Sequence, residues 1–171
     1  MSIMYLFRGV SATGKTVITN ELSKIYGLPV LRKDDIYDSI NIELSHSQKT
    51  KISYDVLAKI IQTNLDLGND IIVDIALPHR PYIEEFLGKI GFDNNKLISF
   101  FCICSDHDEW KRRWTERMKN PAPNQLFISL DEVDNYYKDF DFTLLDGEII
   151  VDSVNDVQSI LCDVAKYWEE K

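Results

Sequence analysis

The segment from Gly9 to Thr16 constrains the fold more than any other part of the sequence. It runs Gly-Val-Ser-Ala-Thr-Gly-Lys-Thr and matches the pattern G-x-x-x-x-G-K-[ST] at every fixed position. An apolar run, Ile3 to Phe7, leads into it, and Val17 to Tyr26, with apolar residues at helical spacing, leads out of it. Such a pattern binds phosphate when it lies between a strand and a helix. The sequence therefore predicts a strand, a phosphate-binding loop and a helix in succession.

The residue types in this loop suit the phosphates of a nucleotide. Glycines allow backbone amides to point at anionic oxygens, and the start of the following helix adds a favourable dipole. Lys15 can reach the β- and γ-phosphates, and we expect its ammonium to be exposed; Thr16 can coordinate Mg²⁺. No N-K-x-D-like guanine signature occurs in the second half of the chain, which argues against a GTPase. We expect ATP to be bound by Gly9, Ser11, Ala12, Thr13, Gly14, Lys15 and Thr16.

Strand-like apolar runs alternate with helix-like segments along almost the whole chain. The expected strands are Ile3 to Phe7, Pro29 to Leu31, Ile71 to Ile75, Leu97 to Ile103 and Glu148 to Val151. Such alternation is typical of α/β folds, in which helical crossovers join parallel strands and ligands bind at the carboxyl edge of the sheet. We therefore expect a three-layer α/β/α sandwich with a five-stranded, mainly parallel sheet. The pattern leaves the strand order open.

Apolar spacing also predicts which helical residues are buried. In the segment Ile52 to Leu67, we expect one buried face formed by Val56, Leu57, Ile60, Ile61 and Leu65. Ser129 and Glu132 have the spacing of a capping box, which predicts a helix start there.

Composition limits the class of protein. The chain has 171 residues, 44% hydrophobic and 27% charged, which suits one globular domain over residues 1–171. No segment has the length of a membrane span and no signal-peptide pattern is present, so we expect a cytoplasmic protein with no membrane partner. Cys102, Cys104 and Cys162 are not spaced for a zinc site or a disulfide framework. The net charge of −9 argues against nucleic acid as a partner. The oligomeric state is left open.

Further motifs follow the phosphate loop in a defined order. They are Leu31-Arg32-Lys33-Asp34-Asp35-Ile36-Tyr37, then Ile72-Val73-Asp74 with Pro78 and Arg80, then Arg113 and Arg117 before Pro121 and Pro123. This order resembles the small P-loop kinases, most closely the kinase domains of the polynucleotide 5′-hydroxyl kinase group. Chloramphenicol phosphotransferase and gluconate kinase are more distant relatives. The resemblance covers nearly the whole chain and implies a P-loop NTPase fold with ATP-dependent phosphoryl transfer.

The resemblance implies that Asp34 is the general base for the acceptor hydroxyl, with Asp35 as the second choice. A physical argument supports Asp34 independently. It ends a predicted strand at the same sheet edge as the phosphate loop, where a carboxylate can orient a hydroxyl near the γ-phosphate. The structural alternative is a helix N-cap, since aspartate is favoured there.

Asp74 closes an apolar strand, as the Walker B carboxylate does. We expect it to hold Mg²⁺ through water together with Thr16, or to hydrogen-bond the phosphate loop or the acceptor; the structural alternative is a cap or turn. A charged residue that ends a buried strand is unusual without a role. Arg80 is either a contact to acceptor or phosphate, as in relatives, or a surface arginine.

Arg113 and Arg117 lie four residues apart on one face of a predicted helix, Glu109 to Arg117. The resemblance implies a lid over about residues 112–125, in which Arg117 stabilises the transferring phosphoryl group and Arg113 contacts adenine or a second phosphate. The alternative is a solvated basic face of the helix.

One departure from the family concerns the acceptor. Polynucleotide kinases carry an arginine that holds the acceptor phosphate two residues after the Asp-Asp pair, and this chain has Tyr37. This favours phosphoryl transfer from ATP to a hydroxyl of a small molecule, with Tyr37 and Tyr54 in the acceptor wall. The alternatives are a polynucleotide 5′-hydroxyl or nucleotide-related kinase, and a nucleotide-dependent binding or switch protein without transfer activity.

Overall fold

The computed structural model describes residues 1–168, so residues 169–171 of the predicted domain lie outside the described part. Five parallel strands form one sheet in the order β2-β3-β1-β4-β5. The strands are β1 (Ile3–Arg8), β2 (Val30–Arg32), β3 (Ile71–Asp74), β4 (Lys96–Ile103) and β5 (Ile149–Asp152). The helices are α1 (Lys15–Tyr26), α2 (Lys33–Ser39), α3 (His46–Asp66), α4 (Arg80–Leu87), α5 (His107–Met118), α6 (Leu130–Tyr137) and α7 (Val157–Ala165).

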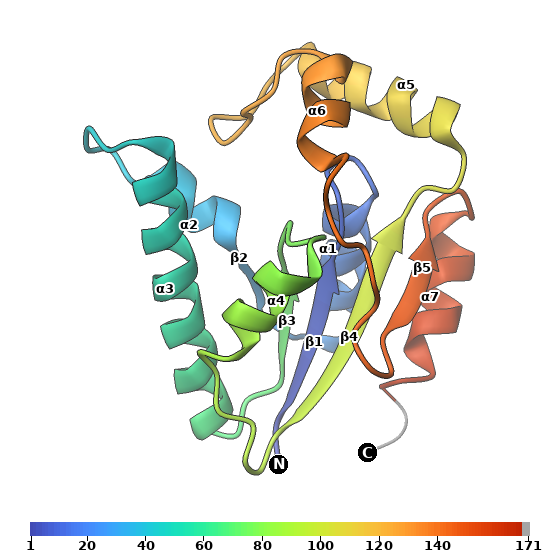
Figure 1. The fold of residues 1–171 in the computed structure, drawn as a ribbon. Coiled ribbons are helices and arrows are strands. Elements are labelled where there is room, and N and C mark those ends of the chain that lie inside the picture. Colours follow the sequence, from blue (N-terminus) through green and yellow to red (C-terminus); the bar gives the residue numbers. More distant parts are fainter. Residues whose placement is uncertain (169–171) are drawn as a thin grey trace.

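Helices cover both faces of the sheet, which confirms the predicted α/β sandwich (Figure 1). Alternate side chains of a strand point to opposite faces. On β1, Tyr5 and Phe7 pack in one core with α1 and α7, whereas Met4 and Leu6 pack in a second core with α3 and α4. Strands buried on both faces are apolar throughout, which is why the apolar runs were visible in the sequence.

All five predicted strands are confirmed, each boundary within one residue of its prediction. Helix α3 begins at His46, earlier than predicted, because Ser45 and Gln48 form a full capping box before the apolar spacing starts. The predicted buried face of α3 was partly wrong, because Val56 and Ile60 are 41% and 37% exposed. Helix α4 was not predicted, and α2 was expected only as a helix-like segment after Asp34 or Asp35. None of the helices in residues 1–168 is long and apolar enough to cross a membrane.

The strand order brings three chain segments together at the carboxyl edge of the sheet. The phosphate loop follows the central strand β1, and Phe7 of that strand is in register with Asp74 at the end of β3. Arg32, at the end of β2, is in register with the same Asp74. Residues from β1, β2 and β3 therefore meet beside the phosphate loop.

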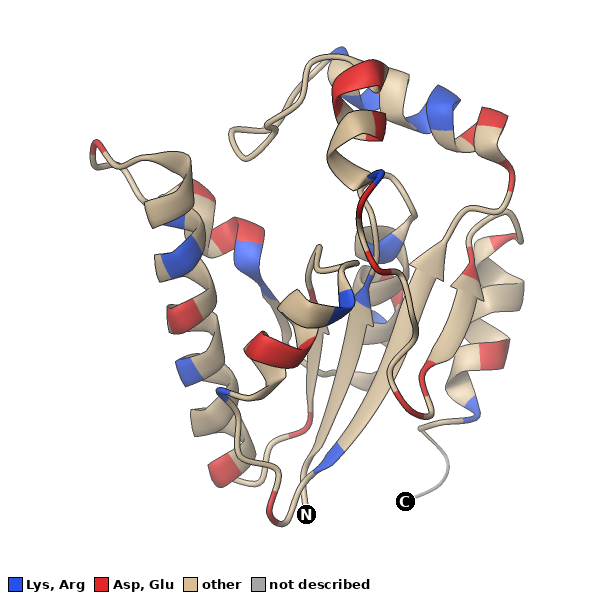
Figure 2. Cartoon of the chain, in the orientation of Figure 1, with Lys and Arg blue, Asp and Glu red and all other residues tan. Residues whose placement is uncertain are grey.

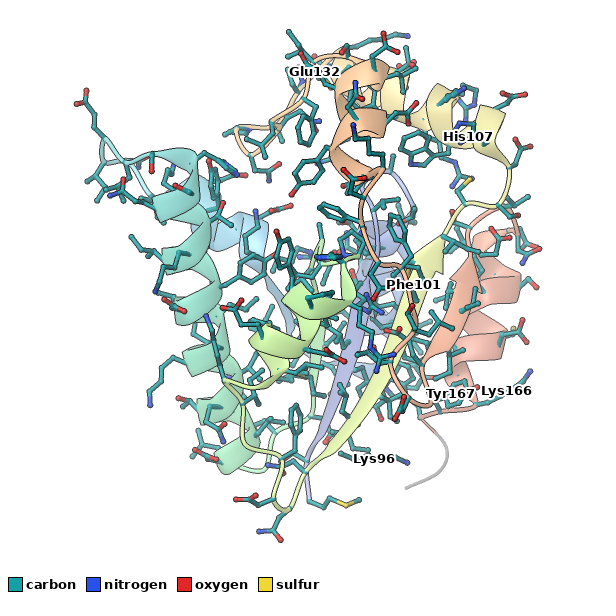
Figure 3. All side chains as sticks on the ribbon, in the orientation of Figure 1. Lys96, Phe101, His107, Glu132, Lys166 and Tyr167 are labelled. Atoms are coloured by element: carbon teal, nitrogen blue, oxygen red, sulfur yellow. The ribbon has the colours of Figure 1, made fainter. Side chains whose placement is uncertain are left out.

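A buried ion pair lies beneath this edge. Arg8 and Glu148 are joined by an Nη2–Oε2 distance of 2.6 Å, and both side chains are 0% exposed. Arg8 also donates to the carbonyl oxygens of Leu77 and Pro78, and its guanidinium lies over the ring of Phe101, which Figure 3 labels beside β4. The pair therefore ties the end of β1 to the start of β5 and to the segment after β3.

Glu148→Gln is expected to lower the free energy of unfolding by about 3–5 kcal/mol, because it leaves the Arg8 charge buried without its partner. Chemical denaturation measures the loss. Asp146→Asn is the matched control: its side chain is fully exposed, 3.9 Å from Arg80, and such pairs contribute about 0–1 kcal/mol. Equal losses in the two variants would contradict a structural role for the buried pair.

Candidate active site

Two glycines of the phosphate loop have a positive φ, a backbone conformation that favours glycine. Gly9 has φ 144°, and a Cβ placed there would lie 2.2 Å from the carbonyl oxygen of Cys102 on β4. Gly14 has φ 76° and precedes α1 directly. The loop is thus held against β4 at its start and leads the helix N-terminus toward the cavity at its end, the arrangement that binds anions.

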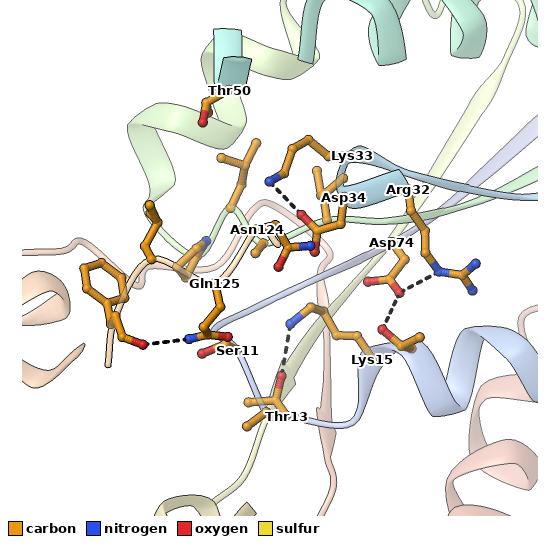
Figure 4. Close-up of a pocket in the computed structure, with 18 of the residues that line it drawn as sticks. Ser11, Thr13, Lys15, Arg32, Lys33, Asp34, Thr50, Asp74, Asn124 and Gln125 are labelled. Carbon is orange, nitrogen blue, oxygen red and sulfur yellow. Dashed lines mark hydrogen bonds and ion pairs between the residues drawn. The ribbon is translucent and has the colours of Figure 1, made fainter. Parts of the chain in front are cut away.

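Lys15 is buried rather than exposed as predicted, because only 8% of it is accessible. Its ammonium donates to the carbonyl oxygens of Gly9 and Val10 at 2.9 and 2.6 Å, and to Thr13 Oγ1 at 3.3 Å (Figure 4). Burial lowers the pKa of Lys15, and the negative charge of Asp74 opposes this shift. A bound phosphate would offer the ammonium acceptors in place of these neutral oxygens.

Asp74 and Thr16, the two predicted Mg²⁺ residues, lie side by side. Thr16 Oγ1 donates to Asp74 Oδ2 at 2.9 Å, and Thr19 Oγ1 donates to the same oxygen at 3.3 Å. Arg32 Nε, which sequence reasoning did not select, also donates to it at 3.3 Å. These three donors fix the carboxylate beside the phosphate loop, as the dashed line of Figure 4 shows for Arg32.

The donor set at this point suits Mg²⁺. Thr16 and Asp74 supply a hydroxyl and a carboxylate oxygen, and Mg²⁺ is typically bound by one or two carboxylates, substrate phosphates and waters. Within residues 1–168 there is no cluster of three or more His, Cys, Asp or Glu that could hold a metal by itself. The arrangement fits a metal held jointly by protein and nucleotide rather than by a protein cage.

Asp34 lies in the first turn of α2 and lines the same cavity as Lys15; Figure 4 labels both side chains. Lys33 Nζ is 2.6 Å from Asp34 Oδ1 and holds the carboxylate in place. The Asp35 side chain, in contrast, is 69% exposed and does not line the cavity. The N-cap alternative for Asp34 is wrong, because Arg32 occupies the N-cap position of α2. The structure therefore gives Asp34 a position open to a ligand.

Helices α5 and α6 pack on the phosphate loop through a third hydrophobic cluster. Trp110, Trp114 and Val133 form its centre, and Val10 and Ala12 of the loop pack against it. Trp110 also donates its indole N–H to the carbonyl oxygen of Ser11 at 2.9 Å. At the start of α5, His107, labelled in Figure 3, stacks on Trp110 with a centroid distance of 5.4 Å. The body of α5 is therefore anchored to the loop.

Of the two predicted lid arginines, only Arg117 lines the cavity. Arg113 donates to Glu109 and to the hydroxyl and carbonyl oxygens of Ser153, which lies beside Gly14. The predicted lid over residues 112–125 therefore includes the end of α5, and the connecting loop itself begins after Met118.

That loop reaches across the cavity. Asn124 Nδ2 donates to Asp38 Oδ2 of α2 at 3.3 Å, and Asn124 and Gln125 are seen beside Asp34 and Lys15 in Figure 4. Segments far apart in the sequence thus line one cavity, and the phosphate loop forms one end of it.

The enclosed cavity measures about 430 Å³, within the range of small-molecule sites. Of the two tyrosines predicted for its acceptor wall, Tyr54 lines it. Tyr37 does not; it is buried behind the cavity and its hydroxyl is 2.8 Å from His46 Nδ1. Arg80, predicted either as a ligand contact or as a surface residue, pairs with Glu84 and donates to the carbonyl oxygen of Leu144.

Several residues of the cavity were missed by sequence reasoning. Lys33 was quoted only as part of a motif, and the aromatic side chains Tyr82, Phe127 and Phe140 were not considered. Their spacing along the chain carries no signal, since they come from α4, the loop after α5 and the segment after α6.

Comparisons with known proteins agree with this geometry. The family model described as AAA domain matches residues 4–140, most of the chain. No curated protein matches the sequence significantly.

Three solved structures share the fold over almost their whole lengths. A sugar kinase from Janibacter sp. HTCC2649 has a TM-score of 0.71 at 15% identity and covers 99% of this chain and 95% of its own. A candidate kinase from Chloroflexus aurantiacus j-10-fl has a TM-score of 0.74 at 17% identity, covering 96% and 97%. A gluconokinase from Sinorhizobium meliloti 1021 has a TM-score of 0.61 at 14% identity, covering 99% and 97%. The chain therefore belongs to the AAA domain family, and its fold is that of the small P-loop kinases.

Proposed function

We propose that the protein transfers the γ-phosphoryl group of ATP to a hydroxyl group of a small-molecule acceptor. The observation that carries this proposal is that Asp34 and the phosphate loop line the same cavity. The two are near enough for the charge of Asp34 to act on the Lys15 ammonium. An acceptor hydroxyl between them would have a base on one side and the phosphoryl group on the other.

Each residue of the site has a role in this proposal. The loop amides and Lys15 bind the β- and γ-phosphates, and Thr16, with Asp74 behind it, holds Mg²⁺, which neutralises phosphate charge. Asp34 accepts the proton of the attacking hydroxyl. Arg117 approaches the transferring group. Arg113 remains a proposed contact to adenine, made beside Ser153 rather than from inside the cavity.

A small molecule is favoured over nucleic acid as the acceptor. Basic and acidic residues alternate along α3 and α5 in Figure 2, and the net charge is −9, so these helices present no continuous basic surface for a phosphate backbone. All three cysteines are free thiols, as is usual in the reducing cytoplasm, the compartment that we propose.

The test is a screen for acceptor-dependent ADP production. The panel contains hydroxyl metabolites, aminoglycoside and phenicol antibiotics, nucleosides and 5′-hydroxyl oligonucleotides, each with ATP and Mg²⁺. We expect a small alcohol to stimulate ADP production in the native protein and not in Lys15→Met, which keeps the aliphatic stem but loses the ammonium. Stimulation by oligonucleotides alone would favour a polynucleotide kinase. ATP binding without any acceptor-dependent turnover would favour a switch protein.

A further inference from the structure

Arg32 and Lys33 are consecutive basic residues, and each pairs with a carboxylate of the cavity. Arg32 ends β2 and Lys33 begins α2. The acidic side chains that line the cavity, among the described residues, are Asp34 and Asp74. Lys33 Nζ is 2.6 Å from Asp34 Oδ1, and Arg32 Nε is 3.3 Å from Asp74 Oδ2. Both carboxylates of the site therefore have a counter-ion that the protein itself supplies.

The carboxylate of Asp74 is shielded from solvent, unlike that of Asp34. The side chain of Asp74 is 6% exposed, whereas that of Asp34 is 43% exposed. Little water screens a buried charge, so its interaction with a neighbouring charge is strong, and the loss of its partner is costly. Asp74 therefore requires a cation beside it, and Arg32 provides one.

Further contacts hold the guanidinium of Arg32 in this position. Its Nη2 donates to Asn20 Oδ1 and, at 3.4 Å, to Thr19 Oγ1, both on α1. Its Nη1 is 3.9 Å from Asp35 Oδ2 in the first turn of α2. The side chain of Arg32 is only 20% exposed. The cation is thus part of the site and is anchored between α1 and α2.

The Asp74 oxygen that Arg32 contacts already accepts several hydrogen bonds. Oδ2 accepts from Thr16 Oγ1 at 2.9 Å and from Thr19 Oγ1 at 3.3 Å, in addition to Arg32. A divalent cation that approached this carboxylate would compete with these donors and would be repelled by the guanidinium. The charge of Asp74 is therefore not available to a metal ion that arrives alone.

The side chains around the cavity have an excess of positive charge. Among the described residues, the basic side chains that line it are Lys15, Arg32, Lys33 and Arg117, against the two carboxylates of Asp34 and Asp74. Nucleotide phosphates would reverse this balance, because they bring several negative charges and the oxygen ligands that Mg²⁺ prefers. The charges of the site thus favour a divalent cation only when a nucleotide is present.

From these contacts we infer that Arg32 is a positioning residue that makes metal binding depend on the nucleotide. It serves as the counter-ion of Asp74 and excludes a free divalent cation from that carboxylate until phosphates are bound. This inference rests on the metal role of Asp74 in the proposed function and adds the order in which the ligands bind. The nucleotide binds before its metal ion or together with it.

Binding of Mn²⁺ without nucleotide tests the inference. Mn²⁺ accepts the same oxygen ligands as Mg²⁺, and its free concentration is measured by electron paramagnetic resonance. Arg32→Gln should bind Mn²⁺ at least about tenfold more tightly than the native protein, because a buried carboxylate has lost its counter-ion. Arg32→Lys keeps the charge and should bind Mn²⁺ as weakly as the native protein. Equal affinities in Arg32→Gln and the native protein would overturn the inference.

Lys24→Gln is the matched control for the change in net charge. Lys24 lies on α1, is 71% exposed and pairs with Glu21, so its removal should leave the affinity for Mn²⁺ unchanged. In the double variant Arg32→Gln/Asp74→Asn the tighter binding should disappear, because the carboxylate that attracts the metal is absent. Tight binding that persists in the double variant would contradict the role given to Arg32.

Thermal unfolding separates this role from a merely structural one. Loss of a structural contact would lower the Tm of Arg32→Gln equally with and without Mn²⁺. We expect Mn²⁺ to raise the Tm of Arg32→Gln more than that of the native protein, because a ligand of the folded state stabilises it in proportion to its affinity. The native protein alone also provides a test. Tight Mn²⁺ binding in the absence of nucleotide that is lost in Asp74→Asn would overturn the inference without any Arg32 variant.

The two proposals fail separately in these experiments. Metal binding is measured without phosphoryl transfer, so the expected Mn²⁺ results in a protein that phosphorylates no acceptor contradict the proposed function alone. Transfer activity in a native protein whose Asp74 binds Mn²⁺ tightly without nucleotide contradicts the order of binding and leaves the kinase function intact.

Discussion

Arg117→Ala is expected to lower kcat by about 10³- to 10⁵-fold, the effect of an arginine that stabilises developing phosphoryl charge. Arg117 lines the cavity and forms no ion pair within residues 1–168, so its guanidinium is available to a ligand. Because we propose that Arg117 contacts the phosphoryl group chiefly in the transition state, the Michaelis constant for ATP should change little. Steady-state kinetics with ATP and the acceptor found in the screen measure both quantities.

Arg112→Ala is the matched control for this variant. Arg112 lies on the same helix, is 67% exposed and pairs with Glu109, and it does not line the cavity. Its removal changes the net charge of α5 by the same amount and should leave kcat nearly unchanged. If Arg117→Ala changed only the affinity for ATP, or changed neither quantity, the role of Arg117 in transfer would be contradicted. The basic residues of α5 would then form a solvated face of the helix.

Asp34→Asn should slow transfer by about 10²- to 10⁴-fold while ATP affinity is preserved. The substitution keeps the size of the side chain but removes the carboxylate that we propose as acceptor of the hydroxyl proton. The substitution also leaves Lys33 without the carboxylate that lies 2.6 Å from its ammonium. The affinity for the acceptor should therefore be measured together with kcat. Single-turnover kinetics, with ATP binding followed by calorimetry, separate the chemical step from nucleotide binding.

Asp35→Asn serves as the comparison for the base, because the two aspartates are adjacent and the structure turns only one toward the cavity. We expect Asp35→Asn to retain transfer activity. A large loss in Asp35→Asn would move the base by one residue, and full activity in both variants would remove this pair from the proton transfer.

The sequence by itself determined the features that depend only on residues close to one another along the chain. The phosphate loop is one contiguous segment, and its glycines and flanking strand and helix are needed within a few positions of one another. The central strands β1 and β3 were predicted closely because burial on both faces makes each one a nearly uninterrupted apolar run. Asp74 was selected because it ends a buried strand, whereas Asp34 was selected from the resemblance in motif order, with its place at the end of a predicted strand as independent support.

The tertiary structure decided which of these residues meet. Arg32 pairs with Asp74 at a separation of 42 positions, and Arg8 pairs with Glu148 at a separation of 140. Both contacts depend on the strand order β2-β3-β1-β4-β5, which the apolar pattern cannot specify because any order buries similar strands. The position of the aromatic side chains that line the cavity also depends on how the chain after β4 folds back over it.

Apolar spacing also failed to orient α3 fully. It marked Val56 and Ile60 as buried, but the sheet and α4 cover only the narrower stripe of Leu57, Ile61 and Leu65. The width of a helical contact is set by the surface opposite it, so it becomes known only when the partner elements are in place.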